Sequence, residues 1–462
     1  MKQKYNNSGK YKFDLIVIGS GAAGSVAAFT AAASGKRVCL IEQHKFGGET
    51  IHHGTIPTKK LMETAKRLTQ LKTAHRYGIR VSAVSYNYRL VQNLKEQAVE
   101  QTGVYDQFKS YKSDNITSLR GHAHFIDANT VSVGLKHLSA NKFLIATGAT
   151  PIIPNIPGLD SVDFVTYQQI YSLPRPPKSL FIIGGGAVAY ETAQIFASLG
   201  CKVHIAETRD HLLPFEDPEV GDSAEAALQS LGVKVFTSAK IINISNKMAR
   251  KIIIFEQGGQ HFQANVEMVM IACGKKPYAD FGLDNASIGH AANGIAVNRF
   301  LQTTVKHIFA AGEVTGAVSN THGALQQARV AAHNMFSRKK IAMEYHAIPR
   351  VIYGCPEIAA TGYTEHYLKA SGKPYQTAIA PIGLVGKSIV TDYSDGFVKL
   401  LATHNGILLG ASIAAPNASE MIGELNLAIH YRMRACQIAK TVHAMPTWSE
   451  AIRVAASKIY CV

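Results

Sequence analysis

Near the amino terminus, a short apolar run is followed by a cluster of glycines and then by a longer stretch of small, mostly apolar residues. The run FDLIVI (residues 13–18) has the length and composition of a buried strand, and glycines within residues 19–24 interrupt it. The stretch SVAAFTAAASGK then predicts a helix that ends at a glycine, and RVCLIE (residues 37–42) predicts a second buried strand. The pattern therefore predicts a strand–turn–helix–strand unit.

Gly19, Gly21 and Gly24 of this unit match the spacing G-x-G-x-x-G. The first glycine permits a tight turn, the second lets the backbone approach a pyrophosphate, and the third allows the helix to pack closely on the strand. The phosphate then lies at the helix N-terminus. Glu42, at the end of the second strand, is placed to accept hydrogen bonds from a ribose. The segment therefore predicts a dinucleotide-binding unit.

The same pattern returns in LFIIGGGAVAYETAQIFASLGCKVHIAE, which begins at residue 180. Gly184, Gly186 and Ala189 occupy the three turn positions, and Glu207 follows Gly184 by 23 residues, as Glu42 follows the first glycine of its own turn. Two such units in one chain predict two bound dinucleotides. Electron transfer between two bound dinucleotides is the simplest reason for one chain to contain two such units.

Length, charge and hydropathy narrow the class of protein. With 462 residues the chain is expected to form three or four domains. Its 48 basic and 32 acidic residues give a formal charge of +16, which fits either steering of anionic dinucleotides or a solvated basic surface. No block of basic residues indicates nucleic-acid binding, and no apolar run is long enough for an integral membrane segment. A cytoplasmic protein is therefore expected.

The six cysteines are scattered along the chain, at positions 39, 201, 273, 355, 436 and 461. None has the C-x-x-C spacing of a metal site or a redox pair, and the positions do not indicate a disulfide framework. No metal is predicted, and buried, reduced thiols are the expectation.

Further motifs extend along nearly the whole chain. ATGA (146–149) and ACGKKP (272–277) follow the two nucleotide units, IFAAGEV covers residues 308–314, and VHAMPTWSEA covers residues 442–451. Together with the two glycine turns, these motifs resemble the pyridine nucleotide-disulfide oxidoreductase family, which includes dihydrolipoamide dehydrogenase, glutathione reductase and mercuric reductase. The resemblance implies an α/β fold with two Rossmann-like dinucleotide-binding domains and an α+β C-terminal dimerisation domain.

By this resemblance the first dinucleotide is FAD, the second is NAD(H) and/or NADP(H), and the protein is a homodimer. The implied domains are an FAD-binding domain (1–150), an NAD(P)-binding domain (151–276), a central segment returning to the FAD domain (277–341) and the dimerisation domain (342–462). The implied FAD contacts are Gly19, Gly21, Gly24, Glu42, Gly48, Thr50, Thr55, Lys59, Ala123, Thr147, Gly148, Gly312 and Glu313. The implied nicotinamide-nucleotide contacts are Gly184, Gly186, Ala189, Glu191, Glu207, Arg209 and Gly274.

The segment GGETIHHGTIPTKK (47–60) departs from the family at its most reactive positions. By resemblance, Thr50 and Thr55 stand where disulfide reductases carry two redox cysteines, and a threonine hydroxyl forms neither a thiolate nor a disulfide. Met445 stands where the family's acid–base histidine precedes Pro-Thr, and Glu450 corresponds to the partner of that histidine. The thiol relay is therefore predicted to be absent.

The residues that seat the flavin are retained. By resemblance, Lys59 places its ammonium near flavin N5 and pairs with Glu191, and a cation there stabilises a reduced, anionic flavin. Glu49 stands where a small residue approaches the pyrophosphate, so its carboxylate is expected to turn outward. His52 and Glu450 are candidates for protonating an acceptor, with a packed or surface role as the alternative for His52.

The features that select the nicotinamide nucleotide conflict. Glu207 favours NAD(H), because a carboxylate accepts hydrogen bonds from the ribose and repels a 2′-phosphate. Ala189 is a feature of NADP-dependent relatives, and Arg209 either reaches a 2′-phosphate or pairs with a surface carboxylate. Both nucleotides remain open.

Residues 52–59 (H-x-G-T-I-P-T-K) and 208–213 (TRDxLL) are similar to those of soluble, energy-independent transhydrogenases. This similarity implies hydride transfer from NAD(P)H through FAD to another nicotinamide nucleotide. The alternatives are an NAD(P)H oxidase or diaphorase, a reductase like dihydrolipoamide dehydrogenase or mercuric reductase, and a non-catalytic flavoprotein with a redox-sensing or binding role. Nicotinamide nucleotides and an unidentified small-molecule acceptor are the expected partners.

Overall fold

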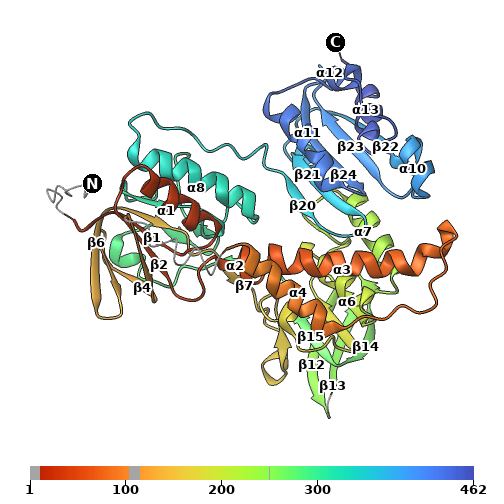
Figure 1. Ribbon diagram of the computed structural model, residues 1–462, viewed down its shortest axis with the longest axis horizontal. Coiled ribbons are helices and arrows are strands. Elements are labelled where there is room, and N and C mark those ends of the chain that lie inside the picture. The colour runs from red at the N-terminus through yellow and green to blue at the C-terminus, as the bar shows by residue number, and fades with distance from the viewer. Residues whose placement is uncertain (1–10, 104–114, 249, 462) are drawn as a thin grey trace. The chain divides into compact units, whose positions relative to one another are not determined.

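The computed structural model describes residues 11–103, 115–248 and 250–461. The chain forms two compact units, one from residues 1–57, 95–151 and 275–343 and the other from residues 58–94, 152–274 and 344–462. Figure 1 traces the path of the chain, which passes between the units within helices α3 (Thr55–Thr73) and α4 (Tyr88–Gln101).

The first unit is built on a seven-stranded sheet in the order β3-β2-β1-β6-β5-β4, with β19 beside β6. The five strands β3, β2, β1, β6 and β19 are parallel to one another, and β4 and β5 add antiparallel pairs. Parallel strands are buried on both faces, which explains the continuous apolar runs of β1 and β2. The strands are β1 (Phe13–Ile18), β2 (Val38–Glu42), β3 (Ile116–Arg120), β4 (Ala123–Asp127), β5 (Thr130–Val133), β6 (Lys136–Ile145) and β19 (Ile308–Ala310).

Helices α1 (Ala22–Ala33) and α8 (Thr321–Phe336) lie side by side in the first unit (Figure 1). Their buried positions are mostly alanines and glycines, so their backbones approach closely. The first unit also contains α2 (Gly48–His52) and two short strand pairs, β7 (Ala149–Pro151) with β16 (Lys275–Pro277) and β17 (His290–Ala291) with β18 (Gly294–Ile295).

The second unit contains a parallel sheet in the order β11-β10-β9-β15-β8. A separate antiparallel sheet follows the order β12-β13-β14. Helices α6 (Ala187–Ser198) and α7 (Pro218–Ser230) belong to this part of the chain. The strands are β8 (Phe164–Val165), β9 (Ser179–Ile183), β10 (Lys202–Ala206), β11 (Lys234–Phe236), β12 (Ala239–Lys247), β13 (Arg250–Gln257), β14 (Gln260–Val266) and β15 (Met268–Ile271).

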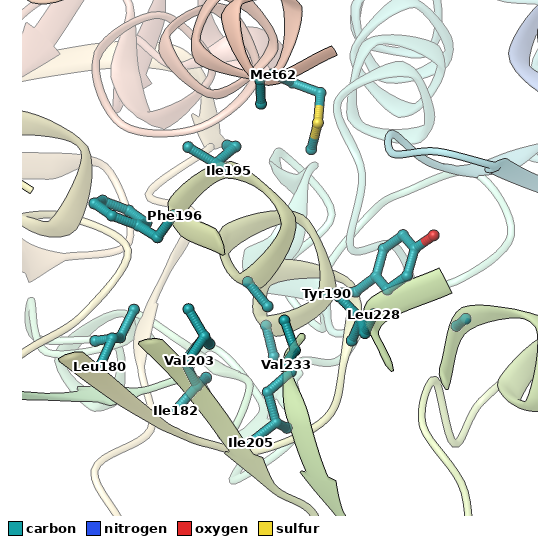
Figure 2. Packing of buried hydrophobic residues seen from close by; sticks show 14 of the residues in the cluster. Met62, Leu180, Ile182, Tyr190, Ile195, Phe196, Val203, Ile205, Leu228 and Val233 are labelled. Atoms are coloured by element: carbon teal, nitrogen blue, oxygen red, sulfur yellow. The ribbon is translucent and has the colours of Figure 1, made fainter. Parts of the chain in front are cut away.

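The core of this part of the second unit lies between α6 and the parallel sheet. Figure 2 shows Ile195 and Phe196 of the helix above the side chains of Leu180, Ile182 and other strand residues. All four of these side chains are fully buried. Burial of such side chains stabilises the fold by roughly 1.5–3 kcal/mol each, and it fixes the position of the glycine turn between β9 and α6.

The carboxyl-terminal part of the second unit has a five-stranded antiparallel sheet in the order β20-β21-β24-β23-β22. Its strands are β20 (Arg350–Ile352), β21 (Glu357–Gly362), β22 (Gln376–Pro381), β23 (Phe397–Ala402) and β24 (Leu408–Ala415). Its helices are α9 (Glu365–Ala370), α10 (Gly386–Thr391), α11 (Ala418–His430), α12 (Ala435–Lys440) and α13 (Glu450–Ser457). Within the described ranges, no helix has both the length and the apolar character needed to cross a bilayer.

The α/β fold and both predicted strand–turn–helix–strand units are confirmed. One expectation about the cysteines is wrong. Cys39 and Cys201 are buried, but Cys355 is exposed and the remaining three are partly exposed. The apolar pattern predicts burial correctly for Cys39, which lies in a buried strand, and for Cys201, which follows α6. It gives no such information for cysteines in loops or in the short, partly exposed helix α12.

Candidate active site

The first glycine turn, between β1 and α1, leaves no room for side chains. Gly19 has φ +96°, and a Cβ at this position would lie 2.3 Å from the carbonyl oxygen of Ala146. A Cβ at Gly24 would lie 1.9 Å from the carbonyl oxygen of Gly19. Gly21 is the N-cap of α1, so the unpaired N–H groups of the first helical turn begin here. The turn fits a pyrophosphate at the helix N-terminus.

Glu42 is held in position by the backbone of this turn. Its Oε2 accepts hydrogen bonds from the backbone N–H (2.9 Å) and the hydroxyl (2.8 Å) of Ser20, and its Oε1 accepts from the N–H of His44 (2.8 Å). The carboxylate is buried, with 8% of the residue exposed. Oε1 accepts one hydrogen bond and retains capacity for a second, which fits the predicted ribose contact.

Gly48, the first residue of α2, packs against the first glycine turn. It has φ +65°, and a Cβ there would lie 2.5 Å from the Cα of Gly21. The backbone of GGETIHH therefore touches the glycine turn, and any larger residue at position 48 would push the two apart. The contact brings Glu49, the next residue, to the edge of the predicted pyrophosphate site.

Glu49 does not simply turn outward, as the sequence led us to expect. Its Oε1 lies 2.9 Å from the ammonium of Lys275, which also binds Oε1 of Glu313. Burial works against the charge of Lys275, but Glu49 and Glu313 outweigh it and raise the pKa of the ammonium. Burial raises the pKa of Glu313; Lys275 opposes this effect and the charge of Glu49 adds to it. One ammonium thus forms ion pairs with two carboxylates beside the predicted cofactor site and offsets part of their charge.

Sequence reasoning missed Lys275. The motif ACGKKP was assigned only as the exit from the nucleotide domain, and its first lysine is 226 residues from Glu49. The signal that pointed to it was the unexplained Glu49 itself, since a partly buried carboxylate beside a phosphate site requires a cationic partner.

The other predicted FAD contacts in the first unit have defined partners. Gly312 has φ +89° and donates its N–H to Oε1 of Gln327 (2.7 Å). The hydroxyl of Thr147 donates to the carbonyl of Tyr278 (2.8 Å), and the carbonyl of Gly148 accepts from the N–H of the same tyrosine (3.0 Å). Ala123 is buried at the start of β4. Their contacts with FAD remain predictions.

Thr50 and Thr55 lie in α2 and at the start of α3. The hydroxyl of Thr50 shares a hydrogen bond of 2.9 Å with the hydroxyl of Thr321. Nε2 of His52 lies 2.8 Å from the carbonyl oxygen of Phe46. His52 is therefore tied to the backbone and partly buried, which favours the packed alternative over a proton-donating role.

The second glycine turn, between β9 and α6, repeats the first. Gly184 has φ +108°, and a Cβ there would lie 2.4 Å from the carbonyl oxygen of Ala272. Gly186 is the N-cap of α6, and Ala189 is fully buried against the sheet. Gly274, with φ +98°, follows the strand that ends beside this turn.

Glu207 repeats the arrangement of Glu42. Its Oε2 accepts from the N–H of Gly185 (2.6 Å), and its Oε1 accepts from the N–H of Arg209 (2.8 Å). The guanidinium of Arg209 lies over the exposed ring of Phe215, 5.7 Å from its centre. The position of the Arg209 side chain is thus set by contact with the Phe215 ring and not by an ion pair with a carboxylate. Arg209 remains a candidate for a 2′-phosphate contact.

Lys59 lies in the second unit, in helix α3, and forms a bidentate ion pair with Glu191 of α6. Its ammonium is 2.8 Å and 3.0 Å from the two carboxylate oxygens. The ammonium also lies 4.6 Å from the centre of the Tyr353 ring, and the backbone N–H of Tyr353 donates to Glu191 (2.9 Å). Lys59 retains 29% side-chain exposure, whereas Glu191 has 9%. The pair that the resemblance predicted is therefore formed, with Tyr353 as a third member that the sequence did not indicate.

The residues of the motif VHAMPTWSEA differ in their burial and in their hydrogen-bond partners. Glu450 is buried at the start of α13 and accepts from the N–H of Thr447 (3.2 Å). Met445 is 77% exposed. Nε2 of His443 lies 3.0 Å from Oε1 of Glu424, so this histidine has a structural partner.

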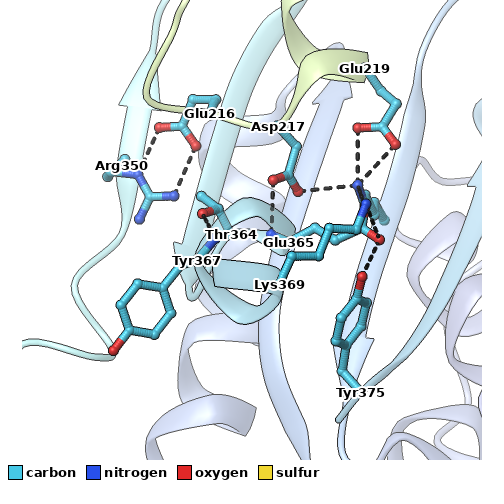
Figure 3. Close-up of polar contacts among 10 residues, drawn as sticks. Glu216, Asp217, Glu219, Arg350, Thr364, Glu365, Tyr367, Lys369 and Tyr375 are labelled. Atoms are coloured by element: carbon cyan, nitrogen blue, oxygen red, sulfur yellow. Dashed lines mark hydrogen bonds and ion pairs between the residues drawn. The ribbon is translucent and has the colours of Figure 1, made fainter. Parts of the chain in front are cut away.

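Asp217, Glu219 and Glu365 converge as a possible metal-binding group in the second unit (Figure 3). The ammonium of Lys399 occupies their centre, at 3.2, 2.9 and 2.7 Å from the three carboxylates. Lys399 is 1% exposed. The lysine supplies the positive charge that these carboxylates require, so the group is an ion-pair network between α7, α9 and β23 and not a candidate metal site.

Two glycine turns that fit pyrophosphates, each with a carboxylate held by its own loop, define the class of a two-dinucleotide oxidoreductase. The model of the pyridine nucleotide-disulphide oxidoreductases matches residues 13–331, and that of their dimerisation domain matches residues 348–456. The chain therefore belongs to the pyridine nucleotide-disulphide oxidoreductase family. Members of this family use FAD and NAD(P)H, and the protein is an FAD-dependent enzyme.

Several relatives match over almost the whole chain. A dihydrolipoyl dehydrogenase of Bacillus subtilis (strain 168) is 32% identical over 449 residues, covering 96% of this chain and 97% of its own. A mercuric reductase of Bacillus cereus is 29% identical, covering 97% of this chain and 72% of its own. The structure of the Cu(II) complex of the HOCl-induced flavoprotein disulfide reductase RclA from Escherichia coli matches with a TM-score of 0.86 and 26% identity, over 97% of this chain and 100% of that chain.

Proposed function

We propose that the enzyme transfers reducing equivalents from NAD(P)H to another nicotinamide nucleotide, as soluble transhydrogenases do, without a protein disulfide. The observation that carries the proposal is the hydrogen bond between the hydroxyls of Thr50 and Thr321 (2.9 Å) in the segment where relatives carry redox thiols. A hydroxyl held in this way has neither the acidity nor the redox chemistry of a cysteine thiol.

The first unit provides the residues that would hold FAD. The glycine turn at residues 19–24 and the N-terminus of α1 would take the pyrophosphate, and Glu42 would take a ribose. Lys275 reduces the negative charge that Glu49 and Glu313 present to that pyrophosphate. When bound, FAD supplies a two-electron carrier that NAD(P)H reduces and that an oxidised acceptor reoxidises.

In the second unit, Lys59 is the group we expect to influence the chemistry. Glu191 orients its ammonium through two hydrogen bonds, and the ring of Tyr353 covers part of it. An ammonium fixed in this way stabilises negative charge that develops nearby as electrons arrive, and no reorganisation of solvent is needed. Glu191 acts as a positioning residue for Lys59.

We propose that either NADH or NADPH reduces the enzyme. A site that accepts both nucleotides would allow hydride to pass from one nucleotide to the other. Glu207 is fixed for the ribose hydroxyls of NAD(H). Arg209 is exposed and lies over Phe215 instead of pairing with a carboxylate, so it is available to a 2′-phosphate.

We further propose a homodimer, supported by the match to the dimerisation domain. Val442, Met445 and Tyr431 are 94%, 77% and 69% exposed, which is unusual for large apolar side chains and fits a surface that a second copy covers. In such a dimer, Met445 and Glu450 would be contributed to the partner's site, as the resemblance implies.

The second candidate function is reduction of a disulfide or of a metal ion, because relatives include dihydrolipoyl dehydrogenase and mercuric reductase. Turnover assays on purified enzyme with bound FAD distinguish the two candidate functions. We expect NADH or NADPH to reduce thio-NAD⁺ with many turnovers, and lipoamide to remain unreduced. The double variant Thr50→Cys/Thr55→Cys serves as the comparison that restores two thiols to the segment.

Turnover of lipoamide or oxidised glutathione by the natural chain, with no reduction of thio-NAD⁺, would refute the proposal. If neither nucleotide bleaches the flavin absorbance, the role is binding or sensing instead. An oxygen-dependent consumption of NADH that thio-NAD⁺ does not suppress would assign an oxidase.

A further inference from the structure

Two cysteines that are 25 positions apart in the sequence meet in the carboxyl-terminal part of the second unit. Cys436 is the second residue of α12, and Cys461 follows the end of α13. The backbone N–H of Cys436 donates to Sγ of Cys461 at 3.2 Å. The two side chains also hydrogen-bond to each other, and both residues are partly exposed.

The position of the Cys461 sulfur is fixed from several sides. The side chain of Gln376 donates to the carbonyl of Tyr460 and accepts from its N–H, both at 3.0 Å, so it clamps the residue before Cys461. A Cβ added at Gly406 would lie 2.4 Å from the Cys461 sulfur. The chain end is therefore held against the loop at Gly406 and the start of α12, with the sulfur in a defined place.

The geometry suits a covalent bond between the two sulfurs. Because an N–Cα bond is about 1.5 Å long, Sγ of Cys461 lies within about 4.7 Å of the Cα of Cys436. The sulfur of Cys461 thus lies beside the residue that carries the second thiol, as a bond between the two sulfurs requires.

The other cysteines in the described ranges have different surroundings. Cys39 and Cys201 are buried, and burial raises the pKa of each thiol to about 12, which protects them from oxidation. Burial and the hydrogen bond with Cys436 also raise the pKa of Cys461, but this cysteine is partly exposed and lies beside a second thiol, with which it can exchange.

We propose that Cys436 and Cys461 are an oxidation site at which a small-molecule disulfide converts the two thiols into an intramolecular disulfide. One protein thiolate attacks a sulfur of the small disulfide and expels one thiolate. The second protein thiolate then attacks the mixed disulfide and expels the other. The two cysteines lose two protons and two electrons, which leave as two molecules of the small thiol.

The bond would close a ring that contains α12, α13 and the exposed segment around Met445. A disulfide stabilises chiefly by restricting the unfolded chain, so the oxidised protein is expected to melt at a higher temperature. The site is independent of the proposed nucleotide exchange, because none of its residues belongs to the predicted cofactor sites.

The test uses the full chain with bound FAD and glutathione disulfide as the oxidant. We expect the count of reactive thiols in the unfolded protein to fall from six to four and the mass to fall by two hydrogens. Peptide mapping without reductant is expected to find the fragment that links Cys436 to Cys461. Dithiothreitol is expected to reverse all three changes.

Single variants make the assignment specific. Cys436→Ser and Cys461→Ser are expected to stop at the mixed disulfide and to carry one glutathione on the remaining thiol of the pair. Cys355→Ser is the matched control, because this exposed cysteine lies outside the pair and its variant is expected to form the same cross-link. Retention of all six thiols by the natural chain, an unresolved mixed disulfide on it, or a cross-link that survives in Cys436→Ser would overturn the proposal.

Discussion

Replacing Lys275 by methionine removes an ammonium that forms ion pairs with both Glu49 and Glu313, and keeps a side chain of similar length. Both carboxylates then lose this ion pair beside the predicted pyrophosphate site. We expect two consequences, a loss of stability in the first unit and weaker binding of FAD.

The stability loss follows from the burial of the three side chains. Removing one partner of a fully buried ion pair costs about 3–5 kcal/mol. Lys275, Glu49 and Glu313 retain 21%, 32% and 17% exposure, so solvent screens part of the cost and about 2–3 kcal/mol is expected. The pKa of Glu313 is already raised by burial. Without Lys275 it rises further, so the loss is largest above neutral pH and shrinks as Glu313 takes up a proton at lower pH.

The affinity loss follows from the place of Glu49 beside Gly48. Two like unit charges at a separation of about 8 Å, in a medium with an effective dielectric constant of about 20–40, repel each other by roughly 1–2 kcal/mol, and we take this as the scale of the repulsion between Glu49 and a phosphate. That repulsion weakens binding about tenfold. The measurement is titration of the apo-protein with FAD, followed by quenching of flavin fluorescence, at pH 8 and pH 5.5.

Two further variants make this experiment decisive. Lys276→Met removes the neighbouring, exposed lysine and is expected to bind FAD as the natural chain does. Adding Glu49→Gln to Lys275→Met is expected to restore most of the affinity, because it removes the charge that the lysine neutralised. Equal FAD affinities for Lys275→Met and Lys276→Met at both pH values would refute the reasoning.

Three other predictions concern the second unit. Lys59→Met is expected to slow reduction of the bound flavin by NADH or NADPH at least tenfold in stopped-flow absorbance, whereas Lys60→Met, at an exposed position, leaves the rate unchanged; equal rates would contradict a role for the ammonium. Lys399→Met is expected to lower the free energy of unfolding by about 3 kcal/mol in urea, because it leaves Asp217 buried without its cation; a loss below about 1 kcal/mol would show that the network is not needed. The pKa of Glu365 is lowered to about 2, since hydrogen bonds from Lys399 and others outweigh the opposing effect of burial. Its contribution is therefore present above its unfolded pKa of about 4.3 and lost as the pH falls towards 2, so a Glu365→Gln variant should show a flatter acid-unfolding profile.

The parts of the molecule that the sequence predicted are those specified by neighbouring residues. Each strand–turn–helix–strand unit is read from an apolar run, three turn positions and one acidic residue within a short stretch. The steric reasons for Gly19 and Gly184 are the same in both turns, since a Cβ at either would strike a carbonyl oxygen. Local patterns of this kind retain their meaning in any fold that contains them.

The features that the sequence did not predict depend on pairs that are far apart in the chain. Nothing near Lys275 in the sequence indicates Glu49, and nothing near Lys399 indicates Asp217, although each lysine is the partner that its carboxylates require. The meeting of Cys436 with the chain end is of the same kind. Side-chain charge and burial reveal that a partner is needed, but the fold decides which residue supplies it.

The two acidic residues of the glycine turns also bear on how such a chain evolves. Glu42 accepts hydrogen bonds from Ser20 and His44, and Glu207 accepts them from Gly185 and Arg209. Each partner of Glu207 lies 165 positions after the corresponding partner of Glu42. Each carboxylate is thus anchored within its own strand–turn–helix–strand unit, and neither relies on the other for its orientation. Substitutions around Glu207 therefore leave the contacts of Glu42 in place, so the two predicted nucleotide sites are able to change independently during evolution.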